Sequence, residues 1–238
     1  AGTLTMKRFY KSCAAAPAEG GYVVTLDDRP VRTPARAVLT VPNQALADAI
    51  AMEWDGQGEE VLPLTMPMMR LATTAIDRVA TQRDAILDDL ASYGGSDLLC
   101  YRAEQPRELV ERQSAQWQPL IDWAACEYDA VLSVTGSLVA VQQPEPALRA
   151  LRRPLEALDA FDLVASHTVP SSTGSLVVAL ALLAGRIDGK MAFELGALDD
   201  LYALEVWGED MEARERLNGV RDTILAAEHL LALVRNPG

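Results

Sequence analysis

The hydrophobic pattern changes abruptly along this chain, and the change limits the folds that it can adopt. In the first 42 residues the pattern is that of short strands: the β-branched run at 22–26 follows Gly20-Gly21 and is closed by Asp27-Asp28. Such runs between turn residues are typical of hairpins. The sequence predicts further strands at 7–11, 29–33 and 37–41, which together form a small antiparallel sheet.

Beyond this segment the apolar residues recur at helical spacing. Asn43 is a suitable N-cap for a helix that reaches Trp54, and the chain has an almost wholly helical pattern from Met68 onward. Helices are predicted at about 145–159, 161–185, 189–207 and 211–234, with a short hairpin insert at 131–141. The predicted fold is α+β: a small N-terminal antiparallel β-rich domain with one helix (1–66), followed by a larger all-helical C-terminal domain (67–238).

The charge and the cysteines exclude several classes of protein. The chain of 238 residues has a formal net charge of -13, so it should repel nucleic acid and anionic membranes at neutral pH. The most apolar run, at 175–185, is too short to span a bilayer and is predicted to be a buried helix. The three cysteines are far apart and form no CxxC pair, which favours a reducing compartment without a disulfide framework.

One set of residues has the types that a hydrolase uses. His167 lies near Ser171 and Asp162 in the sequence, but no GxSxG motif is present and the three crowd into one local stretch. A small-molecule, hydrolase-like enzyme using His167 and nearby serines is kept as an alternative, and it predicts an apolar pocket around the histidine.

Motifs for nucleotides and metals are lacking. The sequence contains no GxGxxG, and the glycines around Lys190 lack the spacing of a phosphate loop. Adjacent acids such as those at 59–60, 88–89 and 199–200 point apart on a helix and seldom bind one ion together. We therefore predict no catalytic residues, no cofactor and no metal site.

Two acidic segments are the most unusual feature of the sequence. Residues 37–69 contain five acids and no Lys or Arg, and residues 191–213 contain seven acids and no base. Each includes a tryptophan among carboxylates, in EWD at 53–55 and in WGED at 207–210. Surface carboxylates ordinarily alternate with basic side chains, so these unpaired acids indicate a surface that binds another protein.

The four tryptophans fall into two groups. Trp117 and Trp123 lie at helical spacing and are predicted to be core residues. Trp54 and Trp207 each stand at a predicted helix end, beside Asp or Gly. Two interpretations stay open for this second pair: packing between the domains, or contact with a binding partner, where Trp is strongly enriched.

Several motifs, in order along the chain, resemble one family. They are KRFYK at 7–11, LDDRPVRTP at 26–34, EWD at 53–55, MP at 66–67, DLLCYR at 97–102, WQPLIDW at 117–123 and EVWGED at 205–210. On these motifs the sequence resembles the assembly chaperones that act on the alpha subunit of the ATP synthase F1 head, the F1-ATPase assembly factor 2 family. The resemblance extends from about residue 6 to residue 234.

The resemblance implies a non-enzymatic protein that needs no cofactor. Such a protein binds the unassembled alpha subunit, shields its beta-facing surface and releases it to the beta subunit without ATP hydrolysis. The implied fold is a β-rich N-terminal domain and a helical C-terminal domain. Eukaryotic relatives work in the mitochondrial matrix, whereas we expect this chain, which shows no presequence, in a bacterial cytoplasm and as a monomer when free. The alternative of an acidic adaptor with a different client stays open.

The resemblance also implies a set of partner-binding residues. These are Glu53, Trp54, Asp55, Asp199, Asp200, Glu205, Trp207 and Gly208. Asp200 takes the place of an acidic residue, typically Glu, that is functionally important in the family. We expect Asp199, Asp200 and Glu205 to supply charge contacts, with Trp207 packed beneath them.

Overall fold

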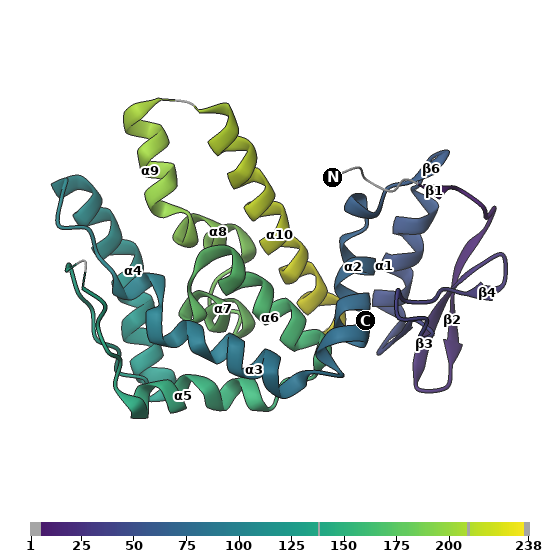
Figure 1. Cartoon of the computed structure of the whole chain (residues 1–238), viewed down its shortest axis with the longest axis horizontal. Helices are drawn as coiled ribbons and strands as arrows, with labels where there is room; N and C mark the ends of the chain where they lie inside the picture. Colours follow the sequence, from purple (N-terminus) through teal and green to yellow (C-terminus); the bar gives the residue numbers. More distant parts are fainter. Residues whose placement is uncertain (1–5, 138, 209, 236–238) are drawn as a thin grey trace. The chain divides into compact units, whose positions relative to one another are not determined.

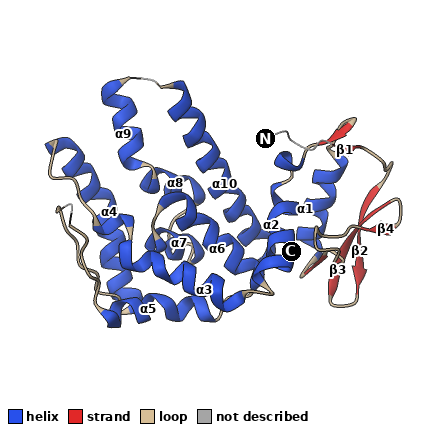
Figure 2. Ribbon diagram, in the orientation of Figure 1, coloured by secondary structure: helices blue, strands red, loops and turns tan. Residues whose placement is uncertain are grey.

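The computed structural model describes residues 6–137, 139–208 and 210–235, which form two compact units. Unit 1 contains the chain up to Arg83, residues 160–165 and the chain's end from His229, and unit 2 contains Asp84–Asp159 and Ser166–Glu228. The fold is α+β, as predicted, with antiparallel strands near the N-terminus followed by helices (Figures 1 and 2). The domain boundary near residue 66 stays a prediction.

A four-stranded antiparallel sheet forms the β part of unit 1. Its central strand β3 (Gly21–Leu26) pairs with β2 (Cys13–Ala18), and also with β4 (Arg29–Pro30) and β5 (Thr40–Val41). A separate two-stranded ladder joins β1 (Met6–Lys7) to β6 (Glu60–Val61). The predicted strand at 22–26 is confirmed as β3.

The other strand predictions need correction. Strand β2 was not predicted, because its Cys-Ala-Ala-Ala-Pro-Ala sequence has weak β propensity, although it pairs with β3 over its whole length. The strands predicted at 29–33 and 37–41 are reduced to β4 and β5. The reason is that the chain between them closes on itself, with the Thr33 N–H donating to the Ala37 carbonyl. The strand predicted at 7–11 is reduced to β1.

The turn between β3 and β4 consists of Asp27 and Asp28, whose φ angles are 47° and 65°. Positive φ at both central residues is what a type I′ hairpin turn requires. The Asp27 carboxylate accepts hydrogen bonds from the backbone N–H groups of Ser12 and Lys11, and these bonds lower its pKa. The turn therefore also anchors the segment that leads into β2.

Helix α1 (Gln44–Asp55) packs on β2 and β3 through fully buried residues that include Leu46 and Ile50. The predicted N-cap is confirmed: the Asn43 Oδ1 accepts from the Leu46 N–H at 3.0 Å. The Asn43 Nδ2 also donates to the Leu233 carbonyl at 2.9 Å, which ties the chain's C-terminal segment into unit 1. Unit 1 further contains η1 (Pro63–Thr65), α2 (Pro67–Thr74) and the π-helical η2 (Ala75–Val79).

The remaining elements are helical. They are α3 (Arg83–Ser92), η3 (Tyr93–Ser96), η4 (Leu98–Cys100), α4 (Arg107–Tyr128), α5 (Glu145–Glu156), α6 (Ala160–Thr173), α7 (Leu176–Leu183), α8 (Gly189–Gly196), α9 (Leu198–Trp207) and α10 (Met211–Arg235). The helices predicted at 161–185 and 189–207 are each two helices. Gly174, with a φ of 78°, ends α6, and Ser175 caps α7 by accepting from the Val178 N–H.

The hairpin predicted at 131–141 is wrong for the part of that segment that the structure describes, because Thr135 pairs instead with Tyr101 in a parallel bridge. Trp117 is fully buried, as predicted, and its Nε1 donates to the Leu195 carbonyl at 2.9 Å. Trp123 is only half-buried and packs edge-to-face on Tyr128.

Helix α7 is buried on every side, which explains its uniformly apolar sequence. Beside it lies Asp97, a fully buried carboxylate that accepts from the Ser175 Oγ at 2.8 Å and from the N–H groups of Val177 and Leu99. Burial outweighs these bonds and raises the pKa of Asp97 to about 6. Among the described helices, none is long and apolar enough to cross a membrane.

Candidate functional site

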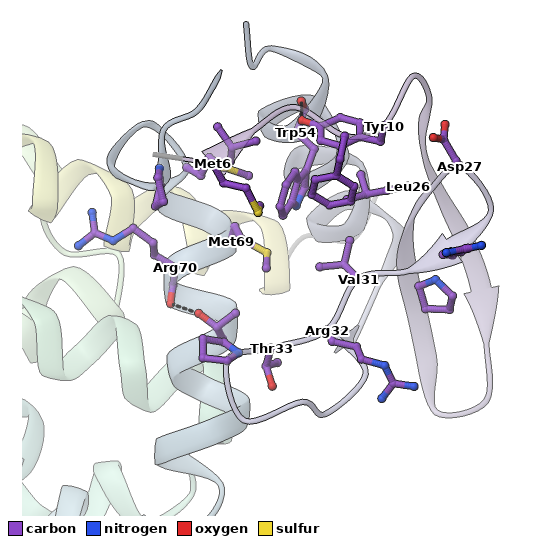
Figure 3. A pocket seen from close by; sticks show the side chains of 18 residues that line it. Met6, Tyr10, Leu26, Asp27, Val31, Arg32, Thr33, Trp54, Met69 and Arg70 are labelled. Atoms are coloured by element: carbon purple, nitrogen blue, oxygen red, sulfur yellow. Dashed lines mark hydrogen bonds between the residues drawn. The ribbon is translucent and has the colours of Figure 1, made fainter. Parts of the chain in front are cut away.

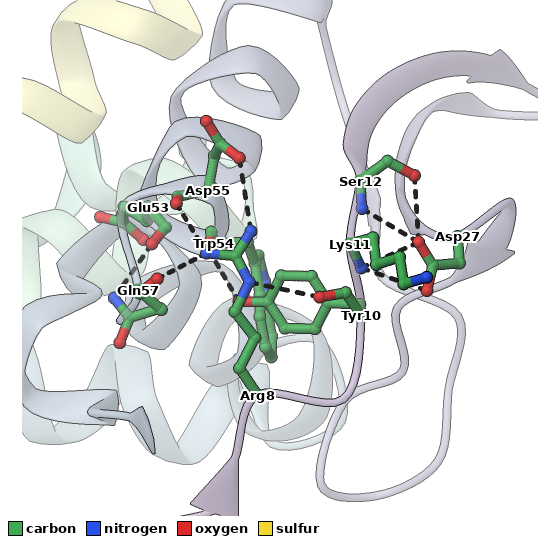
Figure 4. A network of polar contacts seen from close by, with 9 residues as sticks. All are labelled: Arg8, Tyr10, Lys11, Ser12, Asp27, Glu53, Trp54, Asp55 and Gln57. Atoms are coloured by element: carbon green, nitrogen blue, oxygen red, sulfur yellow. Dashed lines mark hydrogen bonds and ion pairs between the residues drawn. The ribbon is translucent and has the colours of Figure 1, made fainter. Parts of the chain in front are cut away.

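The first predicted group, at 53–55, lies at the end of α1 (Figure 4). The Glu53 carboxylate accepts hydrogen bonds from the Met68 N–H at 2.7 Å and the Met69 N–H at 2.8 Å. These are free N–H groups of the first turn of α2, so Glu53 caps that helix. Burial outweighs the two bonds and raises the pKa of Glu53.

Trp54 is buried, with 8% of its surface exposed. Its ring meets the Tyr10 ring edge-to-face at a centroid distance of 5.5 Å, and the Tyr10 hydroxyl donates to the Trp54 carbonyl at 2.7 Å. Among the described residues the Trp54 Nε1 has no hydrogen-bond partner. Burial and ring packing within unit 1 favour a structural role for this tryptophan.

Arg8 closes the network around the end of α1. Its guanidinium donates to the carbonyls of Asp55 at 3.1 Å and Gln57 at 2.5 Å, and it lies 3.5 Å from the Asp55 carboxylate. The same group stacks over the Tyr10 ring at 4.6 Å. A cation at a helix C-terminus satisfies carbonyls that have no partner within the helix. Asp55 itself is exposed.

A cavity of about 790 Å³ adjoins this network within unit 1 (Figure 3). Its lining is largely apolar and includes Met6, Phe9, Leu26, Pro30, Val31, Trp54, Met66 and Met69. Arg29, Arg32 and Arg70 also line it. This cavity was not predicted from the sequence, because its lining residues come from four separate stretches of the chain.

The second predicted group lies on α9 in unit 2, and each of its acids has a partner. The Asp199 carboxylate accepts from the Gln113 Nε2 at 2.7 Å, and the Asp200 carboxylate pairs with Arg216 at 3.0 Å. The Glu205 carboxylate pairs with Arg112 at 2.7 Å. The expectation of unpaired acids was therefore wrong for Asp200 and Glu205, whereas the partner of Asp199 is a neutral amide.

The reason lies in the fold. The partners belong to α4 and α10, which are outside the acidic segment in sequence but adjacent to α9 in space. Beneath the helix, Leu204 packs with Ala197 and with Leu217 of α10.

Trp207 does not pack beneath these acids, because it is the last residue of α9 and is 85% exposed. Gly208, with a φ of 94°, ends the helix and donates its N–H to the Leu204 carbonyl at 3.1 Å. Val206 and Met211 are 51% and 88% exposed. We call Val206, Trp207 and Met211 the apolar tip.

Two members of the apolar tip, Val206 and Met211, were not predicted from the sequence. The available signal was apolar residues on both sides of a helix-breaking glycine inside an acidic segment. Glu209, also in the predicted WGED motif, lies outside the described residues.

The hydrolase-like group is not assembled as a catalytic triad. Asp162 pairs with Arg235 at 3.0 Å, and the His167 Nε2 instead lies 2.6 Å from the Asp89 carboxylate. The Ser171 Oγ lies 3.2 Å from the His167 Nδ1 but donates its proton to the His167 carbonyl at 2.7 Å. A hydrolytic triad has the carboxylate on Nδ1 and the serine on Nε2, the reverse of this arrangement.

In the described part of the chain, no group of three or more His, Cys, Asp or Glu side chains is placed to bind a metal ion.

The fold matches solved structures along nearly its whole length. The crystal structure of Atp12 from Paracoccus denitrificans has 41% sequence identity and a TM-score of 0.91, over 96% of this chain and 98% of that one. A model of the ATP12 chaperone protein family matches residues 7–125. The chain belongs to the ATP12 chaperone family. This confirms the resemblance inferred from the sequence motifs.

Two further comparisons agree, one with a mutant of the same bacterial protein and one with a mitochondrial relative. An Asp-to-Lys mutant of the Paracoccus denitrificans protein has the same identity of 41% and TM-score of 0.91. The mitochondrial protein atp12 of Schizosaccharomyces pombe is 26% identical over 96% of this chain and 82% of its own length.

Proposed function

We propose that this ATP12 family member is an assembly chaperone for the alpha subunit of the ATP synthase F1 head. It binds the unassembled alpha subunit, shields the surface that later faces the beta subunit, and releases alpha to beta without ATP hydrolysis. The observation that carries the proposal is the exposure of Trp207, 85% of whose surface faces solvent on a folded helix. Exposed aromatic groups on a stable element are typical of binding sites.

The apolar tip suits the centre of an interface. Trp207 has Val206 beside it and Met211 across the helix break, and all three are more than half exposed. Covering a side chain such as Met211 is worth roughly 2 kcal/mol, and a tryptophan hot spot contributes about 2 kcal/mol or more. An orphan subunit exposes a comparable apolar interface that would otherwise aggregate.

The charged side chains of α9 suit the rim of the same interface. Arg112 and Arg216 orient the carboxylates of Glu205 and Asp200, and both pairs are exposed to solvent. Exposed ion pairs are weak, so either carboxylate can exchange its partner for a basic group on a client at little cost. Charges at a rim accelerate encounter and exclude wrong partners.

The reversed Asp89–His167–Ser171 arrangement supports a non-enzymatic role. Because the hydroxyl proton of Ser171 is donated to a backbone carbonyl, the histidine is not placed to act as its base.

The chain is 41% identical to the Paracoccus denitrificans protein and 26% identical to the fission-yeast mitochondrial one. We propose that it acts in a bacterial cytoplasm, which the higher identity to the Paracoccus denitrificans protein supports.

Co-purification tests the identity of the client. The tagged chain is co-expressed with the alpha subunit alone and with the beta subunit alone. Recovery of alpha but not beta, reduced by Trp207→Ala, supports the proposal. The matched control is Val131→Ala, because Val131 is also apolar and is 67% exposed elsewhere in unit 2. Recovery of neither subunit, or of beta alone, contradicts the proposal and favours an adaptor with another client.

A further inference from the structure

The cavity of unit 1 has a charge that is unusual for this protein. Arg29, Arg32 and Arg70 line it. Among the described residues no ion pair joins any of the three to a carboxylate, and the Arg32 guanidinium donates to the Arg36 carbonyl at 2.8 Å. Asp27 is the one acid in the lining, and its carboxylate is already bonded to Ser12 and Lys11. The local charge is therefore positive, in a chain with a net charge of -13.

The apolar surface continues outside the cavity. Phe9 and Met6 line it and are 63% and 49% exposed. Leu62 and Leu64, which flank the lining residue Pro63, are 42% and 69% exposed. A small carboxylate would leave these side chains uncovered, whereas a polypeptide segment would cover them together. The cavity volume of about 790 Å³ is within the range that holds several side chains.

We propose that this cavity binds a segment of a partner protein that presents apolar side chains next to acidic residues. The apolar side chains fill the space between Leu26, Val31 and Met69, and the carboxylates pair with the arginines around it, of which Arg32 and Arg70 extend away from that space on opposite sides (Figure 3). Guanidinium groups suit this role, because they bind carboxylates with two parallel hydrogen bonds. The inference concerns unit 1 alone and does not depend on the function proposed for the apolar tip.

A matched pair of peptides distinguishes binding at this cavity from attraction to the overall negative charge of the protein. The first probe is a fluorescein-labelled peptide of about twelve Leu, Phe and Glu residues, and the second replaces each Glu with Lys. Fluorescence anisotropy should show micromolar binding of the Glu peptide and about tenfold weaker binding of the Lys peptide. The overall charge alone favours the Lys peptide, so equal or tighter binding of that peptide overturns the inference.

Variants place the binding at the cavity. Arg70→Glu should weaken binding of the Glu peptide by about tenfold, whereas Arg78→Glu should change it less than about twofold. Arg78 is a fair control because it is an exposed arginine of unit 1 outside the cavity lining. Equal effects of the two variants, at unchanged melting temperatures, contradict the inference. Displacement of a bound fluorescent fatty acid by laurate without any peptide binding contradicts it also.

Discussion

The Tyr10 hydroxyl donates a hydrogen bond to the Trp54 carbonyl at 2.7 Å while the two rings pack edge-to-face at 5.5 Å. The two residues are 44 positions apart, so the pair joins the segment before the sheet to the end of α1. Both side chains are buried, at 4% and 8% exposure. This pair therefore stabilises the tertiary structure of unit 1.

The first prediction concerns Trp54. Trp54→Ala should lower the free energy of unfolding by about 3–5 kcal/mol, because it removes a buried aromatic group and leaves a cavity. Urea titration followed by circular dichroism measures the change. Trp207→Ala is the control and should leave stability within about 0.5 kcal/mol of wild type, since that side chain is exposed. An unchanged stability of Trp54→Ala would assign Trp54 to a contact surface.

The second prediction concerns the cap of α2. Glu53→Ala should destabilise the protein by about 1–2 kcal/mol, because the N–H groups of Met68 and Met69 lose their acceptor. Glu53→Gln keeps one acceptor oxygen and should lose less than Glu53→Ala. Thermal melts of the two variants give the comparison. Equal stability of Glu53→Ala and wild type would show that solvent replaces the carboxylate without cost.

The third prediction is a pH dependence that arises at Asp97. Its pKa of about 6 is raised above the ordinary value of 3.8, so the folded state binds the proton more tightly than the unfolded state. The stabilising contribution of the protonated Asp97 side chain is complete below pH 3.8 and is lost as the pH rises through about 6. The difference between the two pKa values corresponds to about 3 kcal/mol, and lowering the pH from 7 to 5 should recover about 1 kcal/mol of it.

Asp97→Asn tests this assignment. The amide does not titrate, so the gain in melting temperature between pH 7 and pH 5 should disappear in this variant. Asp222→Asn is the control, because Asp222 is exposed on α10 and should keep the wild-type slope. If Asp97→Asn also keeps that slope, another group is responsible.

The fourth prediction concerns the rim of the apolar tip. Asp200→Lys should weaken binding of the alpha subunit by about tenfold at low salt, because it reverses a rim charge and repels Arg216. Its melting temperature should change little, since the pair with Arg216 is exposed. Asp222→Lys makes the same charge change on α10, so identical losses in the two variants would contradict a specific role for Asp200.

Local patterns predicted much of the fold. The run at 22–26 predicted β3, and Asn43 predicted the start of α1. Strand β2 was not predicted, because its pairing with β3, and not its intrinsic β propensity, makes it a strand. The break between α6 and α7 was also missed, although the polar run 171–175 contains both signals for it: Gly174, which ends α6, and Ser175, which caps α7.

The site was predicted in part. The WGED motif pointed to the end of α9, but the exposure of Trp207 depends on where that helix stops. The partners of Asp200 and Glu205 are Arg216 and Arg112, and the second pair is 93 positions apart in sequence. A linear search for charge balance does not detect such pairs. The cavity was missed for the same reason, since tertiary folding alone brings its lining together.

The binding affinity of the isolated alpha subunit for wild-type protein and for Trp207→Ala is the most direct test of the central claim. Isothermal titration calorimetry at a fixed salt concentration, with Val131→Ala as the control, gives the dissociation constants of the three proteins for the alpha subunit. The account predicts a loss of about 30-fold or more for Trp207→Ala, the equivalent of a 2 kcal/mol hot spot, and no loss for Val131→Ala. Equal affinities of the three proteins for alpha, or no measurable binding of alpha at all, would contradict it.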